Sequence, residues 1–352
     1  MNNSKTWSIL CILLTALVLL AAGSATAVID PFFHYHAPLE QLEYPLNNQR
    51  YQNDGIVRHF DYDALITGTS MTENFKTSEF DALFGVNSIK VSYSGGSYAE
   101  LFSNLRQAFC ANPDIKTVIF CIEEWFLFSG RELILADGEY PTYLYDENPF
   151  NDVKYLLNKE VLCSDTLGVL EYTARGETTT SFDDYGSWVY PYDADVVLGN
   201  YIRPEKAPES SVFTPEEAEN LTANLESTAL ALAREFPDTE FIYYFPPYSI
   251  LNWDNNRQLG TLERNVEAFR LASRLLLTQD NIRLFSFYSD FETVTNLDNY
   301  RDIVHHSNDI NSLLLKRFAS GEYALTAETS DAHWDEVKNF YGSYDYDALF
   351  LP

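Results

Sequence analysis

The chain has 352 residues, of which 46% are hydrophobic and 15% aromatic, so it is long and apolar enough to fold around a substantial core. Asp and Glu total 52 against 23 Lys and Arg, which gives a formal net charge of −29. A chain this acidic repels phosphate backbones, and we therefore exclude nucleic acid as a partner.

The N-terminal residues 1–28 are typical of a targeting element. Lys5 is the only charge before Asp30, and Trp7–Val28 is an apolar run of the length that spans a bilayer as a helix. The run ends in Ala25-Thr26-Ala27, which also fits a signal-peptidase site. We predict an uncleaved anchor with Lys5 inside and the remaining chain, 29–352, outside the cell membrane. A cleaved signal and a secreted protein is the alternative.

The segment that follows, Asp30–Pro38, is rich in aromatic residues. Its two histidines, His34 and His36, have the spacing that lets a strand hold a metal ion, but no third ligand is apparent. We therefore expect an aromatic collar next to the membrane and not a metal site.

From Ala64 onward, short apolar runs alternate with helical patterns, which argues for βαβ units joined by right-handed crossovers. We predict a three-layer α/β/α fold with a flavodoxin-like parallel sheet. The predicted strands are 64–67, 89–93, 117–122, 240–245 and 282–287. The predicted helices are about 73–84, 98–110, 214–236, 259–277, one after Ser307, and 327–340.

A polar and aromatic stretch, about 129–215, interrupts this alternation. We predict an inserted subdomain or lid with one or two short helices, since long ordered insertions between sheet units are usually functional. No internal repeat or Gly/Pro-rich linker divides the rest, so 29–352 is predicted to be one domain.

Four cysteines occur, at positions 11, 110, 121 and 163. They include no CxxC pair and no Cys/His spacing typical of zinc, and three thiols in the folded body make no disulfide framework. We predict no metal and no cofactor.

Ser70 follows the first predicted strand, directly after Gly68 and Thr69. A glycine allows a sharp turn, and a serine at the carboxyl end of a strand lies where open α/β sheets place their reactive groups. A helix beginning there would also point its first amides at developing negative charge. The alternative is that Ser70 only caps the helix.

A serine hydroxyl needs a base to take its proton and a third group to orient that base. Asp302 precedes His305 by three residues, so one tight turn lets the carboxylate accept from Nδ1 while Nε2 points toward a serine. The loop after the last strand reaches the same sheet edge as Ser70. These three residues are the predicted catalytic group.

Gly68-Thr69-Ser70, the pair Gly95-Gly96 after the second strand, and Asp302-x-x-His305 resemble blocks one, two and five of the SGNH/GDSL hydrolases, over about residues 64–318. With the N-terminal anchor, the chain is most similar to the extracytoplasmic branch that includes DltD-like and alginate-acetylation-like proteins. The resemblance implies an SGNH-hydrolase-like fold, with Ser70 as nucleophile, His305 as general base and Asp302 as its orienter. The amides of Ser70 and of Gly95 or Gly96 would form the oxyanion hole.

The chain departs from that pattern at two places. Thr69 stands where the family has Asp, a change that need not affect the chemistry. The third block normally supplies an Asn to the oxyanion hole, and here Glu123-Glu124-Trp125 follows the third strand. Loss of one such donor typically costs about a hundred- to a thousandfold in rate. Ser187 or Trp188 from the insertion could replace it.

Other interpretations remain for several of these residues. Asp302 could cap the following helix, and His306 could be the working imidazole. Asp331-Ala332-His333 is a rival pair with different spacing. Gly95-Gly96 could be only a tight turn, and Glu123 with Glu124 could be paired glycosidase carboxylates, although neighbouring strand residues point to opposite faces.

We therefore expect a serine esterase or O-acyltransferase acting on an acylated cell-envelope glycan or a similar ester. The acidic, aromatic composition suits a neutral or cationic carbohydrate better than an anionic lipid. The alternative is a weak or inactive SGNH-fold envelope protein that binds a glycan or a membrane partner. A phosphate-ester hydrolase is disfavoured because no cluster of metal-binding carboxylates is apparent.

Overall fold

A computed structural model describes residues 3–130, 140–146 and 148–351, so positions 131–139 and 147 of the predicted insertion, and the first two residues of the predicted anchor, lie outside the described residues. The chain divides into two compact units. One contains the segment that ends at Phe60 and the segment that ends at Ser181. The other begins at Asp61 and resumes at Phe182.

The second unit is built on a six-stranded sheet with the order β2-β1-β3-β4-β5-β6. The first five strands are parallel, and β6 pairs antiparallel with β5 at one edge. The predicted α/β fold with a flavodoxin-like parallel sheet is thus confirmed. The strands are β1 (Ala64–Gly68), β2 (Ser88–Ser92), β3 (Thr117–Cys121), β4 (Glu240–Phe245), β5 (Ile282–Ser286) and β6 (Ala324–Leu325).

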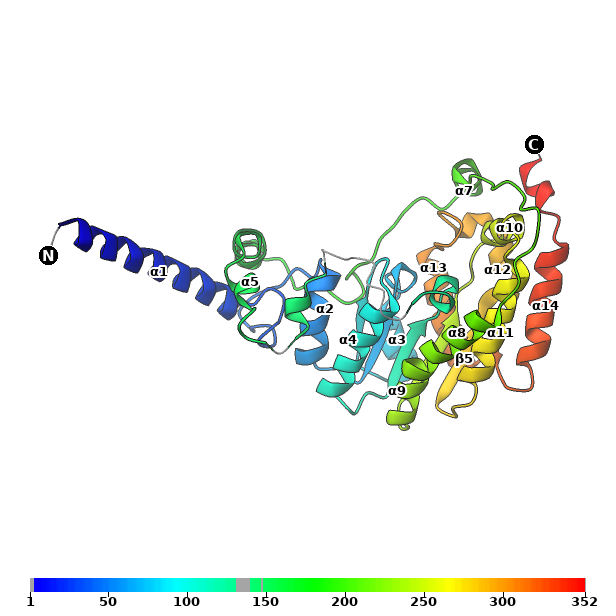
Figure 1. Cartoon of the computed structure of the whole chain (residues 1–352), viewed down its shortest axis with the longest axis horizontal. Coiled ribbons are helices and arrows are strands. Elements are labelled where there is room, and N and C mark those ends of the chain that lie inside the picture. The colour runs from blue at the N-terminus through cyan, green and yellow to red at the C-terminus, as the bar shows by residue number, and fades with distance from the viewer. Residues whose placement is uncertain (1–2, 131–139, 147, 352) are drawn as a thin grey trace. The chain divides into compact units, whose positions relative to one another are not determined.

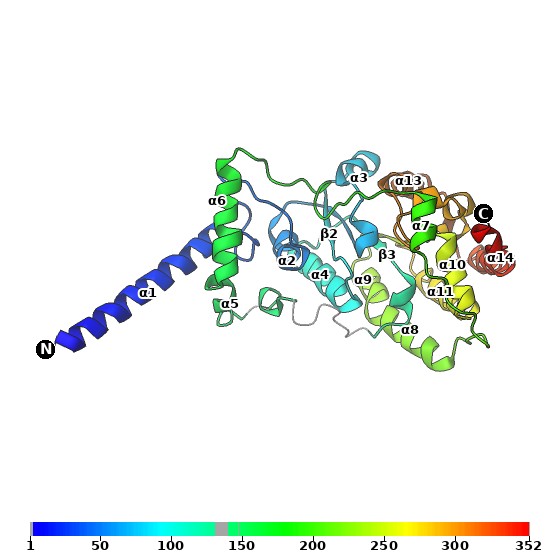
Figure 2. The same cartoon turned by 90° about the horizontal axis from the view of Figure 1, so that it is seen from above.

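Helices cover both faces of this sheet. Figure 2 shows α3 and α13 on one side and α4, α8, α9 and α11 on the other. Helices α11 and α14 lie side by side (Figure 1). The helices of this unit are α3 (Thr77–Phe84), α4 (Tyr98–Ala111), α7 (Ala194–Asn200), α8 (Pro215–Ser227), α9 (Ala229–Glu235), α10 (Ile250–Gln258), α11 (Leu262–Leu276), α12 (Phe291–Thr295), α13 (Asn308–Ser320) and α14 (Ser330–Ser343).

Because helices cover both faces, the central strands are buried on both sides and read as continuous apolar runs. Every residue of β1 and β3 is buried. Around β4 the filling is largely aromatic: Phe245 packs against Phe269 and Trp334 with ring centroids 5.0 and 5.5 Å apart. Much of the chain's high Phe and Tyr content is therefore core.

The structure corrects several predicted boundaries. The helix expected at 73–84 begins only at Thr77, after a short 3₁₀ turn, η1 (Ser70–Thr72). The reason is that the carbonyl groups of Glu73 and Phe75 accept hydrogen bonds from the ammonium of Lys90 instead of helical amides. The helix expected at 214–236 is broken at Thr228, where α8 ends and α9 begins.

The first unit starts with α1 (Asn3–Ile29), which is long and apolar enough to be a membrane span or a signal sequence. Asp30 ends it: the carboxylate accepts hydrogen bonds from the backbone amides of residues 34–36 and from the Tyr155 hydroxyl at 2.7 Å. Phe32 packs against Tyr51 and Tyr155 with ring centroids 5.0 and 5.6 Å apart. Aromatic rings therefore gather directly after α1.

Helix α2 (Gln49–His59) escaped prediction because it has no apolar stripe. It is buried through polar contacts instead: the Gln52 amide bonds the carbonyls of Pro31 and Pro45. A Cβ atom at Gly55 would lie 2.2 Å from the Phe32 carbonyl oxygen, so only glycine permits this close packing.

The described part of the predicted insertion is divided between the two units. The first unit receives η3 (Thr142–Leu144), α5 (Val153–Leu156), the π-helical turn η4 (Val161–Thr166) and α6 (Leu167–Ala174). Thr173 and Thr179 bond the backbone amides of Glu43 and Tyr44, which fixes this segment to the chain before α2. The second unit receives residues from Phe182 onward, including α7.

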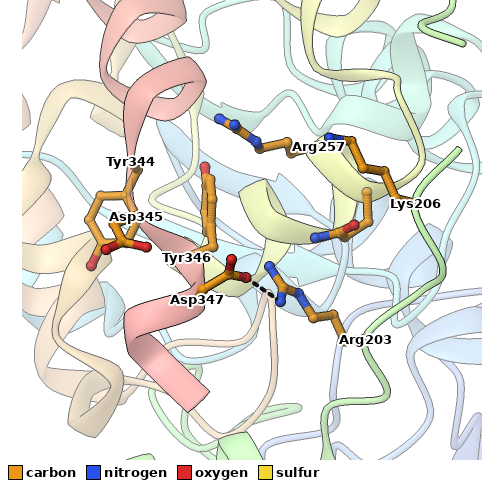
Figure 3. A pocket seen from close by; sticks show the side chains of 8 residues that line it. Arg203, Lys206, Arg257, Tyr344, Asp345, Tyr346 and Asp347 are labelled. Atoms are coloured by element: carbon orange, nitrogen blue, oxygen red, sulfur yellow. Dashed lines mark hydrogen bonds and ion pairs between the residues drawn. The ribbon is translucent and has the colours of Figure 1, made fainter. Parts of the chain in front are cut away.

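In the second unit, Arg203 joins α10 to the C-terminal turn η7 (Tyr346–Phe350). Its guanidinium makes two hydrogen bonds, of 2.8 and 2.9 Å, to the fully buried carboxylate of Asp254, and one of 2.7 Å to Asp347, which is 83% exposed. Figure 3 shows the contact with Asp347 beside Tyr346 and Arg257, at a cavity of about 360 Å³. These hydrogen bonds fasten the C-terminal turn η7 to α10.

Arg203→Met should lower the free energy of unfolding by about 3–5 kcal/mol, because it leaves the buried Asp254 carboxylate without its cationic partner. The hydrogen bonds that Asp254 accepts from Tyr201 and Gln258 remain but carry no compensating charge. Asp347→Asn breaks only the exposed contact and should change stability by less than about 1 kcal/mol. Urea unfolding in detergent, followed by tryptophan fluorescence, measures both. Equal effects of the two substitutions would contradict the distinction.

Candidate active site

Ser70 lies at the first position of η1, immediately beyond the carboxyl end of β1. The turn depends on Gly68, where a Cβ atom would lie 2.6 Å from the Thr72 methyl group and 3.2 Å from the Cys121 Cβ atom. Thr69 caps η1 by accepting a hydrogen bond from the Met71 amide. The cap is therefore Thr69, and the Ser70 hydroxyl is left for other contacts.

The structure brings the three predicted catalytic residues together. Ser70 Oγ lies 2.8 Å from His305 Nε2, and His305 Nδ1 lies 2.8 Å from Asp302 Oδ2. Because both ring nitrogens have partners, Nδ1–H donating to the carboxylate leaves Nε2 as the acceptor facing the serine hydroxyl. This is the geometry in which an imidazole can take a proton from a serine.

The turn that holds His305 is fixed from two directions. Asp302 Oδ1 accepts hydrogen bonds from the amides of Val304 and His305, both at 2.9 Å. The Ile303 carbonyl accepts from the amide and the hydroxyl of Ser249, in the loop after β4. The imidazole therefore sits on a closed turn anchored to the sheet edge.

Asp302 carries its negative charge in this setting. Burial by itself would raise its pKa, but the hydrogen bond and the charge of His305, with the two turn amides, outweigh burial and lower the pKa below its ordinary value. An ionised Asp302 favours the Nδ1–H tautomer of His305 and stabilises the imidazolium that forms when His305 accepts a proton.

The rival histidines are engaged elsewhere. His306 is buried, its Nδ1 faces the Ser307 carbonyl at 3.3 Å, and burial lowers its pKa to about 4. His333 Nε2 contacts the Ser286 hydroxyl. Asp331 does not orient His333, because its carboxylate bonds the guanidinium of Arg274 at 2.9 and 3.0 Å.

The two glycines after β2 have different roles. Gly96 donates its N–H to the Tyr93 carbonyl at 2.7 Å, closing a tight turn. Gly95 has a positive φ of 59° and lines the cavity beside Ser70. Of the two glycine amides named as oxyanion donors, only that of Gly95 belongs to a cavity-lining residue.

Glu123, which stands where the resemblance leads one to expect an Asn, is buried next to the residue that precedes Ser70. Its carboxyl group accepts hydrogen bonds from the hydroxyl of Thr69 and, at 2.6 Å, from that of Tyr248. Burial raises the pKa of Glu123, and the two hydrogen bonds only partly oppose this. Glu123 therefore ties Thr69 to the loop after β4.

A cavity of about 340 Å³ opens beside Ser70 and His305. Its walls include Trp125, Tyr248 and Asn252. The Asn252 side chain is buried and lies near Glu124, but its Nδ2 makes no hydrogen bond of ordinary length and angle with any described residue. Asn252, on α10, is a donor at the site that the sequence did not reveal, because α10 has no apolar periodicity.

A segment of the second unit that comes from the predicted insertion lies against the residues that follow Ser70. Asp183 accepts hydrogen bonds from the hydroxyl groups of Thr77 and Ser78. The Trp188 indole donates to Glu73 at 2.8 Å, and its ring meets His305 edge-on with centroids 5.6 Å apart. The indole N–H is therefore already used and is not the replacement oxyanion donor.

Lys90 links the residues that follow Ser70 to this segment. It is completely buried on β2, and its ammonium donates to the carbonyls of Glu73, Phe75 and Asp183. Burial lowers the pKa of Lys90 to about 8. One cation thus joins the loop after Ser70 to the segment that carries Trp188.

No group of three or more His, Cys, Asp or Glu side chains among the described residues is arranged to hold a metal ion. The histidines of the aromatic segment after α1 have other contacts: His34 lies 3.5 Å from Asp152, and His36 lies 2.7 Å from the Ala37 carbonyl.

No protein-family model matches this chain. No curated protein matches it either. The chain is similar to a solved structure from Streptococcus pneumonia that is provisionally described as a platelet activating factor, at 11% identity and a TM-score of 0.39, over 78% of this chain and 90% of that one. At this level of similarity, only the chain's own residues bear on its function.

The substitution Glu123→Gln tests whether the pKa of the buried Glu123 carboxyl group is raised. Because the folded-state pKa of Glu123 lies above its ordinary value of 4.5, its contribution to stability is complete below that pH and is lost as the pH rises through the folded-state pKa. The free energy of unfolding of the wild type should therefore fall relative to Glu123→Gln above about pH 4.5, by at most about 1.4 kcal/mol per pH unit.

Urea unfolding between pH 4 and pH 8 measures this difference. Glu219→Gln, at an exposed side chain on α8, is the control for replacing a glutamate at the surface. Parallel curves for the wild type and Glu123→Gln would refute the assignment of a raised pKa.

Proposed function

We propose that the protein is an extracytoplasmic serine esterase or O-acyltransferase of SGNH type. The observation that carries the proposal is the unbroken chain of hydrogen bonds from Ser70 through His305 to Asp302. Ser70 Oγ attacks an ester carbonyl while His305 Nε2 accepts the hydroxyl proton. His305 then returns that proton to the departing alcohol, which leaves an acyl-enzyme on Ser70. Water or a sugar hydroxyl, deprotonated by the same imidazole, releases the acyl group.

The negative oxygen of the tetrahedral intermediate needs donors close to Ser70. The amides of Ser70 and Gly95 are two of them. We propose Asn252 Nδ2 as the third, replacing the Asn that Glu123 displaces from its expected position. Its support is the burial of Asn252 and its place in the wall of the same cavity, where the nearby Glu124 carboxyl competes for the amide.

The surroundings of the site support a carbohydrate ester as substrate. Arg301 stacks on Tyr190, with its guanidinium carbon 3.7 Å from the ring centroid, and Trp188 adjoins them. Aromatic faces of this kind suit sugar rings, and a net charge of −29 favours a neutral or cationic glycan. The 340 Å³ cavity, lined in part by Trp125 and Val304, would take the acyl group.

The proposed location of the active unit depends on α1. With Lys5 as the only charge before Asp30, the orientation expected for a span keeps Lys5 in the cytoplasm. The catalytic unit would then act on the outer side of the membrane, where acylated envelope glycans occur.

A non-catalytic protein that binds a glycan or a membrane partner is the second candidate. The buried Glu123 favours it, since a carboxyl group replaces a neutral amide in the third block. The two candidates are distinguished by covalent reactivity: the esterase has a reactive Ser70 hydroxyl, and the binding protein does not.

The wild type should be labelled by a fluorophosphonate, which reacts with an activated serine. Ser70→Ala should abolish labelling, and His305→Ala should slow it by at least about a hundredfold because the general base is lost. Ser343→Ala, at an exposed serine at the end of α14, is the control and should label normally. Absence of labelling in the folded wild type would favour the binding protein.

Asn252→Ala should lower kcat for a chromogenic acetyl ester by about a hundred- to a thousandfold with a much smaller change in KM, because an oxyanion donor acts mainly in the transition state. Steady-state kinetics measure the separation. A rise in KM at unchanged kcat would assign Asn252 to substrate binding only.

A further inference from the structure

An apolar groove runs along the second half of α1, entirely within the first unit. The cavity measures about 700 Å³. One wall is a single stripe of α1 that includes Ala16, Leu20 and Gly23, and the other includes Phe150 and Val153 at the start of α5. This groove is separate from the proposed active site, which belongs to the second unit.

The groove exists because α1 is narrow where α5 approaches it. A Cβ atom at Gly23 would lie 3.4 Å from Leu157 Cδ2 and 3.7 Å from Leu156 Cβ. Small residues in a membrane helix permit such close approach of a second element. Phe150, which lines the same groove, is 90% exposed.

The end of α1 is part of the folded unit. Thr26 is fully buried, the Ile29 carbonyl accepts a hydrogen bond from Tyr44, and Asp30 binds Tyr155. A peptidase needs an exposed segment, whereas the Ala25–Ala27 site lies in a packed helix. These contacts favour α1 as an anchor that stays attached to the protein.

The position of the groove along α1 determines how deep in the bilayer the groove would lie. Ala27 lies eleven positions after Ala16, which is about 16 Å along the helix. A bilayer core is about 30 Å thick, so the groove has the length of one leaflet. Lys5 lies at the other end of the helix, which assigns the groove to the outer leaflet.

The side chains near the groove fit this depth. Val153 and Leu157 are exposed apolar residues on or next to α5, and Leu167 and Leu170 are exposed on α6 of the same unit. Past the end of α1, Tyr143 and Tyr145 pack around the cluster of Phe32 and Tyr155. Tyrosines of this kind gather where a bilayer meets water.

We infer that this groove binds lipid acyl chains and that the α5 segment is embedded in the outer leaflet beside α1. The occupant is an acyl chain because the groove is apolar, as long as one leaflet, and walled by the membrane helix itself. The inference rests on the proposal that α1 spans the membrane, but not on the esterase chemistry.

The test uses the full-length protein in lipid nanodiscs, with Cys11, Cys110 and Cys163 changed to Ser and the buried Cys121 kept. A fluorophore is attached to single cysteines from Phe150→Cys, Leu13→Cys and Val212→Cys. Leu13, exposed on α1, reports whether the helix spans. Val212, 76% exposed in the second unit, is the aqueous control.

Quenching by lipids that carry a nitroxide on the acyl chain should be several-fold stronger at positions 150 and 13 than at 212, and aqueous iodide should show the reverse order. Iodide quenching at 150 with lipid quenching at 13 would overturn the groove assignment and leave the membrane span intact. Iodide quenching at 13 would overturn both. Protection at 150 from both quenchers would mean that protein fills the groove, which also rejects acyl chains.

Retained lipid gives an independent measurement. Phe150→Glu should lose most of the phospholipid that native mass spectrometry detects on the detergent-purified wild type. Val212→Glu, the same change at a similarly exposed apolar residue, should keep it. Equal lipid on both variants would contradict the inference, whereas esterase activity of either variant bears only on the proposed function.

Discussion

The contact between Ser70 and His305 depends on a constraint of the parallel sheet. Strands that run in the same direction end at one edge, so groups separated by 235 positions in the sequence meet there. The meeting is held by the loop after β4: the Tyr300 hydroxyl donates to the Pro247 carbonyl, and Ser249 binds Ile303. The proposed chemistry therefore depends on how firmly these loops are fastened to the sheet edge.

Near Ser70, two buried ionisable side chains, Glu123 and Lys90, hold these loops in place. Neither side chain is hydrogen-bonded to the proposed triad. Glu123 links Thr69 to Tyr248, and Lys90 links the carbonyls after Ser70 to Asp183. A buried polar group is costly unless it is bonded, and both have partners. Glu123 thus contributes rigidity at the position where the resemblance in sequence predicts an Asn that donates a hydrogen bond.

The first unit is stabilised by a different set of contacts. Its order comes from polar contacts around Asp30 and Gln52 and from aromatic packing around Phe32. Such contacts position the end of α1 without a large apolar core. Apolar side chains of this unit, such as Phe150, remain exposed, as expected for a surface that contacts lipid.

The sequence by itself determined the alternation of strands and helices, the apolar helix, and the residues of the proposed triad. It did so because periodicity and short spacings are local: Asp302 and His305 lie within one turn, and Gly68 lies two residues before Ser70. Helices α2 and α10 carry no apolar stripe, so only tertiary contacts identified them. The division of residues 129–215 between two units, the bonding of Glu123 and the position of the Asn252 amide were also decided by the tertiary structure. Each of these depends on partners distant in the chain, and no local pattern encodes which distant partner a buried polar group will bind.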